Sequence, residues 1–324
     1  MSKYFIGVDG GGTKTHACLI DSAGKVISTA ANGAANWERI GVVSAQRSLS
    51  EVIDEVISSA NLSYAQITGI TLALAGIDWG SDTEIFVPFV ESIGLSQGAA
   101  FINDAIAALY AGVPSGIGCA SIAGTGGKTV AQDGKTVVKT MGMSLGEGGG
   151  AGQLMDLAIH RMAQAIHGQA SQTDMNQIIP TFFGMDNAKT FFKAIARDDL
   201  HIPEELAPLV FQAAAAQDAG AQEVVAHVAR QHAKDVIGLV GQLTFNEKGF
   251  DVVRAGGLHT AGSETFDKTF EETLTAAYPH ARPHVLQIAP VIGAAIHAAT
   301  QNMGPLPDPF LKEVFSGARQ ATHF

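Results

Sequence analysis

The sequence of 324 residues contains only two cysteines, Cys18 and Cys119, and both stand inside apolar, strand-like runs. A disulfide framework is therefore not expected, and a cysteine-ligated zinc or iron–sulfur site would lack ligands. Positive charge is also scarce: 20 lysine and arginine residues face 31 aspartate and glutamate residues, which gives a net charge of −11. This balance argues against nucleic acid and against an anionic membrane surface as partners.

Long apolar runs are missing as well, and the first residues do not have the layout of a signal peptide. We therefore expect a soluble, cytoplasmic protein that binds neither membrane nor nucleic acid. Hydrophobic residues nevertheless make up 46% of the chain, which is enough for one large or two ordinary domains. Glycine is abundant, with 37 residues that fall in clusters, and these clusters mark the candidate functional loops.

The first glycine cluster follows directly on the first apolar run. Residues 4–8 lead into Asp9-Gly10-Gly11-Gly12-Thr13-Lys14-Thr15, and two further apolar runs follow. The pattern predicts strand, glycine loop, strand, turn and strand. Glycines let backbone N–H groups converge on an anion, while Asp9 stands where a carboxylate could face a metal ion through water. A simple hairpin turn is the alternative, although it needs only one or two glycines.

The opening pattern returns in the middle of the chain. Alternating strand and helix patterns over residues 1–113 predict one α/β domain. A strand over 118–123 then leads into Gly124-Thr125-Gly126-Gly127-Lys128-Thr129, whose last four residues match Gly12 to Thr15 in position. This internal repeat predicts two duplicated α/β domains, over 1–113 and 114–300, the second with a helical insertion, and a tail over 301–324.

Polar residues at the ends of predicted elements are candidates for chemistry. Asn103-Asp104 lies between a short strand and a helix, where ligands meet the sheet in α/β folds. Asp104 could accept the proton of an attacking hydroxyl, or it could simply cap the helix. Asn36-Trp37 stands in a small-residue loop and offers an amide and an aromatic face to a sugar, or a Trp packed on its own domain.

Two later glycine stretches complete the set. Gly142 to Gly152 precedes a helix and contains Glu147 between glycines, where it could reach a ligand or belong to the first helical turn. The strand-like run 252–255 ends at Gly256-Gly257 and leads into a helix. Glycines there would let a nucleoside lie against the backbone, although an ordinary strand–turn–helix is the alternative.

Asp9 to Thr15 resembles the first phosphate loop of the sugar kinase, actin and heat-shock ATPase superfamily. Over residues 4–300 the chain resembles the N-acetylglucosamine kinases of the BadF/BadG/BcrA/BcrD ATPase family. The resemblance implies two duplicated actin-like (ribonuclease H-like) α/β domains with an interdomain cleft, and ATP and Mg²⁺ as cofactors. Where these kinases have Gly-Asp-Glu-Gly-Ser, this chain has Gly146-Glu147-Gly148-Gly149-Gly150, which leaves the identity of the sugar open.

The resemblance also implies a role for each matching residue. Asp104 would be the catalytic base, and Asp9 would hold Mg²⁺ through water. The expected ATP contacts are Gly10, Gly11, Gly12, Thr13, Lys14, Thr15, Gly124, Thr125, Gly126 and Gly127 at the phosphates, and Gly256 and Gly257 at the adenosine. The expected sugar contacts are Asn36, Trp37, Gly76, Asn103, Asp104, Gly142 and Glu147.

The expected function is an ATP-dependent kinase that phosphorylates an amino sugar, N-acetyl-D-glucosamine at its 6-hydroxyl, and we also expect a homodimer. A glucosamine kinase is the alternative within the class. An ATPase that activates a dehydratase or reductase would share the phosphate loops, but it needs cysteines for a bridging iron–sulfur cluster. A sugar-sensing repressor would need an added DNA-binding module, which we do not expect ahead of the first strand.

Overall fold

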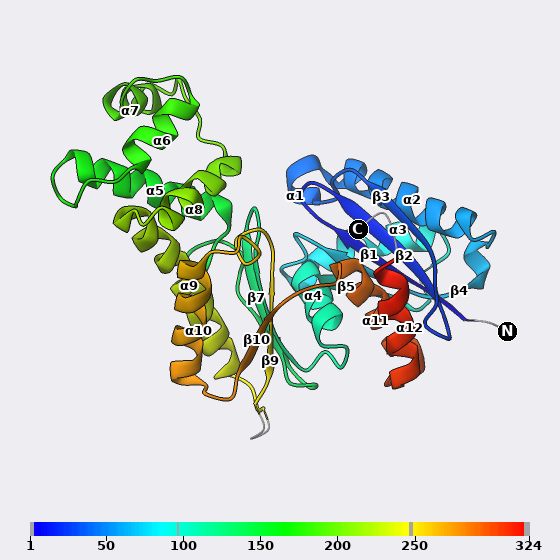
Figure 1. Ribbon diagram of the computed structural model, residues 1–324. Helices are drawn as coiled ribbons and strands as arrows, with labels where there is room; N and C mark the ends of the chain where they lie inside the picture. Colours follow the sequence, from blue (N-terminus) through cyan, green and yellow to red (C-terminus); the bar gives the residue numbers. More distant parts are fainter. Residues whose placement is uncertain (1–2, 96, 246–248, 321–324) are drawn as a thin grey trace. The chain divides into compact units, whose positions relative to one another are not determined.

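The computed structural model describes residues 3–95, 97–245 and 249–320. The chain forms two compact units (Figure 1): unit 1 comprises 1–120, 132–137 and 286–324, and unit 2 comprises 121–131 and 138–285. Residues 286–324 thus group with unit 1, whereas the sequence analysis expected the second domain to end at 300 and a separate tail to follow. They group with unit 1 because Val291 and Phe310 are buried in one apolar cluster with Phe5 of the first strand.

Unit 1 is built on a five-stranded sheet with the order β3-β2-β1-β4-β5. Its strands are β1 (Tyr4–Gly10), β2 (Thr15–Asp21), β3 (Val26–Asn32), β4 (Ile67–Leu74) and β5 (Ala99–Asn103). β1 pairs antiparallel with β2 and parallel with β4, and β4 pairs parallel with β5, so that Leu74 stands opposite Asn103. The carboxyl ends of β1, β4 and β5 consequently meet at one edge of the sheet.

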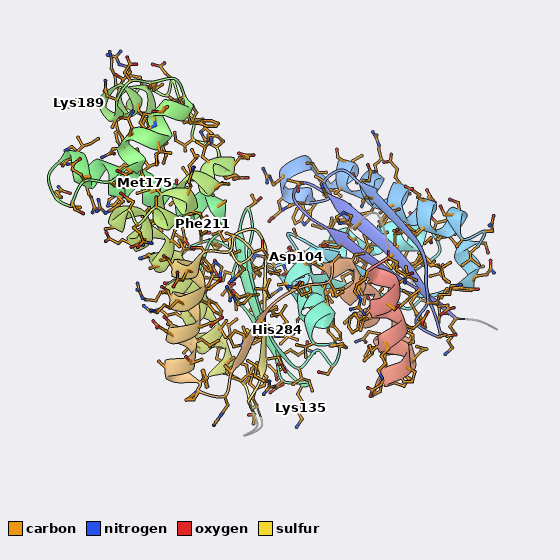
Figure 2. The ribbon with its side chains drawn as sticks, viewed as in Figure 1. Asp104, Lys135, Met175, Lys189, Phe211 and His284 are labelled. Atoms are coloured by element: carbon orange, nitrogen blue, oxygen red, sulfur yellow. The ribbon has the colours of Figure 1, made fainter. Side chains whose placement is uncertain are left out.

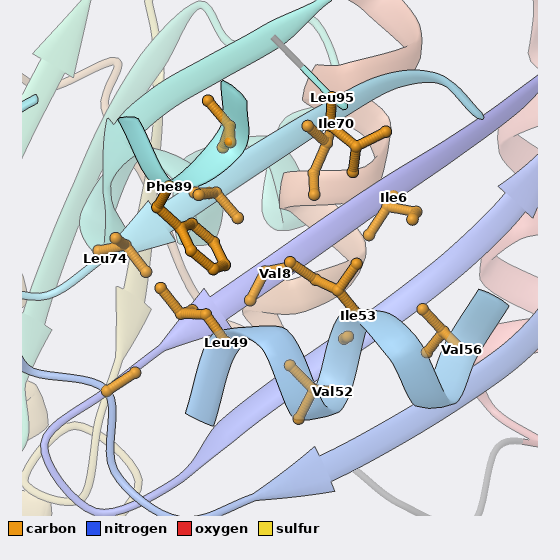
Figure 3. Close-up of a cluster of buried hydrophobic side chains, with 14 of the residues drawn as sticks. Ile6, Val8, Leu49, Val52, Ile53, Val56, Ile70, Leu74, Phe89 and Leu95 are labelled. Atoms are coloured by element: carbon orange, nitrogen blue, oxygen red, sulfur yellow. The ribbon is translucent and has the colours of Figure 1, made fainter. Parts of the chain in front are cut away.

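Helices cover both faces of this sheet. They are α1 (Trp37–Ile40), α2 (Val42–Ser59), α3 (Val87–Ser92), α4 (Asp104–Gly112), α11 (Pro290–Met303) and α12 (Asp308–Ala318), with 3-10 turns at Tyr64–Gln66 and Gly80–Ile85. Side chains alternate along β1, so Ile6 and Val8 pack against α2 (Figure 3) while Phe5 packs against α11. Each face thus has its own apolar core.

The apolar stripe of α2 does not include Val43. Its side chain is 73% exposed, whereas Ala45 and Leu49 are buried. Six residues separate Val43 from Leu49, which places the two side chains about 120° apart around an α-helix. The first turn therefore points Val43 to solvent.

A second five-stranded sheet has the order β10-β9-β6-β7-β8. Its strands are β6 (Gly118–Ala123), β7 (Gly127–Gln132), β8 (Val137–Lys139), β9 (Asp251–Ala255) and β10 (Arg282–Val285). Counted from β8, its strands run third, second, first, fourth and fifth, which is the order of the first sheet. The expected duplication of one α/β fold is therefore confirmed in the strand topology.

The residues of the two glycine loops that match in sequence, however, do not occupy equivalent positions in the structure. Thr15 is the first residue of β2, whereas the second loop is already a strand from Gly127 onward. As a result Lys14 is an exposed loop residue, while Lys128 lies buried in β7. The fold repeats, but the two lysines occupy different environments.

The helices of unit 2 are α5 (Ala151–Ile166), α6 (Met175–Phe182), α7 (Ala188–Ala196), α8 (Ala207–Ala215), α9 (Ala219–Val240) and α10 (Glu264–Ala277), with a 3-10 turn at Glu204–Leu206. α9 begins at the cap Asp218, whose carboxylate accepts a hydrogen bond from the Ala221 N–H. It packs against α5, α8 and α10. Among residues 3–95, 97–245 and 249–320, no helix combines the length and hydropathy needed to cross a bilayer.

Candidate functional site

Asp104 lies at the carboxyl edge of the first sheet, at the start of α4 (Figure 2). The cap of that helix is Asn103, whose Oδ1 accepts a hydrogen bond of 3.0 Å from the Ala105 N–H. Asp104 is the first helical residue, and its Oδ1 accepts from the same N–H at 2.9 Å. Because Asn103 already caps α4, capping does not account for the carboxylate at position 104.

Asp9, the second-last residue of β1, has a strongly perturbed carboxyl group. Burial raises the pKa of Asp9 to about 7, and the negative charge of Asp104 adds to the rise. The two carboxylates are thus close enough to repel each other at the edge where β1 and β5 end. A cation at this edge would stabilise both in their charged forms.

The loop after β4 is fixed by two aspartates that the sequence reading did not single out. Asn103 Nδ2 donates a hydrogen bond of 3.1 Å to Asp78 Oδ1, which joins this loop to the end of β5. Asp82 Oδ2 in turn accepts from the N–H groups of Asp78, at 2.8 Å, and Trp79, at 2.6 Å. The signal available in the sequence was a pair of aspartates spaced like a turn cap just after a glycine-terminated strand.

The loop that carries Asn36 and Trp37 also lies at this end of unit 1. Asn36 caps α1, with its Oδ1 accepting from the Glu38 N–H at 3.0 Å, and Trp37 Nε1 donates to the Gly76 carbonyl at 3.0 Å. Gly76 has a φ of +86°, and a Cβ there would lie 3.0 Å from the indole nitrogen. The structure therefore brings these three expected sugar contacts together, with the indole N–H engaged by backbone.

The first glycine loop contacts the same segment. The Gly11 carbonyl accepts hydrogen bonds from the N–H groups of Ala35 and Asn36, both at 3.1 Å. Thr15 is fully buried, and its hydroxyl donates to the Gly33 carbonyl at 2.7 Å. Thr13 and Lys14 are exposed. Of the polar side chains of this first loop that are expected at the phosphates, Thr13 and Lys14 are therefore the accessible ones.

In unit 2, three glycine segments that are far apart in the sequence pack on one another. The Ala151 N–H donates to the Gly124 carbonyl at 2.8 Å, and the Leu258 N–H donates to the Ala123 carbonyl at 2.9 Å. Gly256 has a φ of +90°, and a Cβ there would lie 2.6 Å from the Ala123 carbonyl oxygen. Residues 124–127, 148–150 and 256–257 consequently form one backbone surface.

Parts of this surface are open. A Cβ built on Gly124, Gly126 or Gly257 would meet nothing within 4 Å in the described structure, and Thr125 is exposed. Backbone that is closely packed on one side and open on the other is what a ligand needs in order to approach the main chain.

Glu147 and Gly142 stand in the loop that leads into α5. Glu147 is only 5% exposed, and its Oε1 accepts hydrogen bonds from the N–H groups of Met143 and, at 2.8 Å, Ser144. Gly142 is exposed and has a φ of +81°. One oxygen of the carboxylate thus closes the turn in which it stands, while the described residues give Oε2 no hydrogen bond.

A buried chain of polar side chains lies behind the glycine surface, and the sequence reading missed it. It links Arg254, His259, Ser121 and His232 to the carbonyl of Gly149. Ser121 and His232 are more than 20 residues from each other and from the pair Arg254 and His259, so the sequence shows no spacing motif. In the part of the chain that the structure describes, no group of three or more His, Cys, Asp and Glu side chains is arranged to hold a metal ion.

Two sheets of the same strand order, each with a glycine loop after its first strand, define the class of duplicated, actin-like α/β proteins. The model of the BadF/BadG/BcrA/BcrD ATPase family matches residues 6–298, and the chain belongs to this family.

Individual relatives agree with the family. The chain is 24% identical over 304 residues to the N-acetylmuramic acid/N-acetylglucosamine kinase of Clostridium acetobutylicum, covering 92% of this chain and 99% of that protein. It is 32% identical over 136 residues to the N-acetyl-D-glucosamine kinase of Dictyostelium discoideum, covering 39% and 43%. A crystal structure of a proposed N-acetylglucosamine kinase from Chromobacterium violaceum has the same fold, with a TM-score of 0.67, 22% identity and coverage of 91% and 98%.

Proposed function

We propose that the protein is an ATP-dependent kinase that phosphorylates an amino sugar, N-acetyl-D-glucosamine, at its 6-hydroxyl. The observation that carries the proposal is Asp104: a carboxylate at the carboxyl edge of the first sheet, beside Asp9 and next to a helix that Asn103 already caps. The kinase names of the relatives from Clostridium acetobutylicum and Dictyostelium discoideum support the reaction and the class of sugar.

Unit 2 supplies the second phosphate loop and the adenosine contacts in this proposal. Gly124, Thr125, Gly126 and Gly127 bind phosphate oxygens, and Gly256 and Gly257 let the adenosine lie against the main chain. The open backbone at Gly124, Gly126 and Gly257 supports this assignment, because an added Cβ would meet nothing there. Backbone N–H groups that are already held in place need no reorganisation when charge develops on the phosphates.

Unit 1 supplies the first phosphate loop, Gly10 to Thr15, and the carboxylate for Mg²⁺. The residues present fit that ion, since Mg²⁺ keeps most of its water and takes one or two carboxylates together with substrate phosphates. Asp9 would hold it through water, and its buried carboxyl, with a pKa raised to about 7, is a group that a cation would stabilise in the charged form. The bound ion would neutralise part of the phosphate charge.

Asp104 acts on the acceptor. It takes the proton of the sugar hydroxyl as the oxygen attacks the γ-phosphorus, while the bond from that phosphorus to the β–γ bridging oxygen breaks and ADP leaves. Asn36, Trp37, Gly76 and Asn103 are the sugar contacts proposed in unit 1, and Gly142 and Glu147 are further proposed contacts. The loops that carry the first three lie together at the edge that bears Asp104, which supports their part of the assignment.

The activator function has less support. Cys18 lies in β2 and Cys119 in β6, and both side chains are fully buried. A cluster that bridges two subunits needs thiolates at a surface, and burial raises the pKa of the Cys18 thiol to about 12.

A coupled ADP-release assay with MgATP tests the proposal. The panel is N-acetylglucosamine, glucosamine, N-acetylmuramic acid and glucose, and phosphorus–carbon couplings in the product identify the esterified oxygen. We expect the highest kcat/KM with N-acetylglucosamine, phosphate on O6, and loss of activity with EDTA. A higher kcat/KM with glucosamine would show that glucosamine, not N-acetylglucosamine, is the preferred substrate. No ADP release above the sugar-free blank with any of the four sugars would refute the proposed kinase activity.

A further inference from the structure

Four buried polar side chains from separate parts of unit 2 form one continuous hydrogen-bonded chain. Ser121 comes from β6, His232 from α9, Arg254 from β9 and His259 from the turn that follows β9. Their exposed fractions are 0%, 0%, 2% and 1% in that order. Buried polar groups are retained when they are fully hydrogen-bonded, because an unpaired group in the interior is costly.

The two ends of this chain fix the direction of every bond in it. The carbonyl of Gly149 can only accept, so His232 Nε2, at 2.8 Å, must carry a proton. His232 Nδ1 then accepts from the Ser121 hydroxyl at 3.1 Å, and the same hydroxyl oxygen accepts from His259 Nε2 at 3.1 Å. His259 Nδ1 accepts from Arg254 Nε at 3.2 Å. One arrangement, with both imidazoles neutral, satisfies all four bonds.

Burial favours that neutral state. It lowers the pKa of His232 to about 4. It also places the pKa of His259 well below its usual range, with the charges of His232 and Arg254 as further causes. The two imidazoles of the hydrogen-bonded chain are therefore neutral at neutral pH, and each keeps the tautomer described above.

The far end of the chain is anchored. Arg254 pairs with Asp267 and, at 3.3 Å, with Glu271, both on α10, and its guanidinium carbon lies 5.1 Å from the centre of the Phe270 ring. An Arg held by two carboxylates and a ring has little freedom. It presents its Nε–H to His259 in one fixed direction.

The near end is the glycine surface. The Gly148 N–H donates to Asp235 Oδ2 at 2.6 Å, and the Gly149 N–H donates to Gln153 Oε1 at 2.8 Å. A Cβ on Gly148 would lie 2.7 Å from the His232 ring, and a Cβ on Gly150 would lie 2.3 Å from the Gly124 carbonyl oxygen. His232 thus holds the segment that packs directly on the second glycine loop.

We propose that Ser121, His232, His259 and Arg254 form a positioning network that holds Gly148–Gly150, and through it the loop 124–127, in the conformation that binds the phosphates of ATP. This inference rests on the proposed function, because that function makes the loop a phosphate site. In this proposal none of the four side chains touches ATP. They act on the phosphate loop only through the hydrogen bond to the carbonyl of Gly149.

Ser121→Ala is the sharpest test, because it removes the one atom that joins the two imidazoles. Two buried nitrogens then lose their partner, and the glycine segment becomes mobile. We expect the KM and Kd for ATP to rise about 5- to 100-fold, with a change below about twofold in the KM for the sugar. The amides of Gly148, Gly149 and Ala151 are all hydrogen-bonded, so their hydrogen exchange should accelerate.

Thr71→Val is the matched control. Thr71 Oγ1 makes a buried hydrogen bond of 2.9 Å to His297 Nδ1, and both residues belong to unit 1, whereas the glycine segments 148–150 and 124–127 belong to unit 2. It should lower thermal stability to a similar extent while leaving exchange at 148–151 unchanged. If Ser121→Ala does not fold, His232→Gln, which keeps a donor for the Gly149 carbonyl, and His232→Leu, which does not, give the comparison. The glutamine should then bind ATP more tightly than the leucine.

The readouts separate the two proposals. Hydrogen exchange on the free protein needs no activity, so it reports on the network even if no sugar is phosphorylated. An ATP Kd that rises no more in Ser121→Ala than in Thr71→Val would overturn the positioning role, as would unchanged exchange at residues 148–151. Equal ATP affinity of the two His232 variants would do the same. Absence of ADP release from the parent protein would instead refute the kinase alone.

Discussion

The backbone N–H of Ala151 donates a hydrogen bond of 2.8 Å to the carbonyl of Gly124, and this bond ties the first residue of α5 to the second glycine loop. Gly150, the cap of that helix, lies against the same loop. A Cβ at this position would stand 2.3, 2.4 and 2.5 Å from the carbonyl oxygens of Gly124, Thr125 and Gly126. The contact leaves no room for any side chain.

Gly150→Ala should therefore displace the loop over residues 124–126. Backbone cannot yield like the end of a flexible side chain, and forced overpacking costs about 1–3 kcal/mol. If that cost appears in nucleotide binding, the Kd for ATP rises about 5- to 150-fold, while the KM for the sugar is unchanged. Calorimetric titration with ATP measures the effect.

Gly152→Ala is the control for that substitution. It lies in the first turn of α5, and a Cβ there would meet nothing within 4 Å in the described structure. Alanine is favoured over glycine within a helix by about 1 kcal/mol, so this variant should keep its ATP affinity and melt slightly higher. Equal losses in the two variants would mean that the contact with Gly124 is not what matters.

Local chemistry made much of the fold predictable. Apolar runs bounded by glycine and turn residues gave the strands of the first sheet, and Asn103-Asp104 marked the start of α4. The packing of α11 on the sheet of unit 1 could not be predicted from the sequence, because its buried residues, 291–299, are mostly small or apolar and carry no signal of which sheet they cover. Packing over long sequence distances decided that.

The candidate site likewise has parts that could be predicted from the sequence and parts that could not. The glycine loops and Asp104 were predicted because the roles proposed for them require a certain residue type next to a strand end. The network of Ser121, His232 and His259 could not, because each residue alone resembles an ordinary buried polar group. Only the tertiary structure places the two imidazoles on either side of one hydroxyl.

Asp104→Asn should lower kcat about 10²- to 10⁴-fold, the usual size of a general-base contribution, with a smaller effect on sugar binding. Asparagine keeps an oxygen for the Ala105 N–H, and Asn103 remains the cap of α4, so thermal stability should hardly change. Steady-state ADP release and a melting curve measure both. Asp78→Asn is the control at the same edge, and we expect it to lower kcat less than tenfold. Near-normal turnover in Asp104→Asn would leave the proposed base without a role.

Glu147→Gln tests whether the sugar contact extends to the loop before α5. Glutamine can still accept from the N–H groups of Met143 and Ser144 through its carbonyl oxygen, so the turn should persist. The lost charge weakens a hydrogen bond to the sugar by about 1.5–3 kcal/mol, which raises the KM for the sugar about 10- to 150-fold and leaves the KM for ATP nearly unchanged. Glu147→Ala should do at least as much damage. An unchanged KM for the sugar in both variants would show that Glu147 does not contact the sugar and only stabilises the turn in which it stands.

The pH dependence of stability follows from three buried groups near the glycine segment. Burial lowers the pKa of His232 to about 4 and holds that of His259 well below its usual range, so between about pH 6.5 and 4 the unfolded chain binds more protons at these residues than the folded protein does. Their contribution to the free energy of unfolding falls as the pH falls. Burial raises the pKa of Asp235 to about 6, and the charge of Glu147 adds to the rise. Asp235 therefore acts in the opposite direction between about pH 6 and 4.

His232→Gln should consequently flatten the loss of stability on acidification. In the parent protein His232 contributes a decrease of up to about 3 kcal/mol in the free energy of unfolding between pH 6.5 and 4, and glutamine does not titrate. Urea unfolding at half-unit pH steps measures the slope, which should be smaller in the variant even if the variant is less stable at pH 7. Asp235→Asn is the counterpart and should steepen it, because it removes the opposing group. Parallel curves for the parent and His232→Gln would show that His232 is protonated equally in the folded and unfolded states, which a neutral imidazole between Ser121 and Gly149 does not allow.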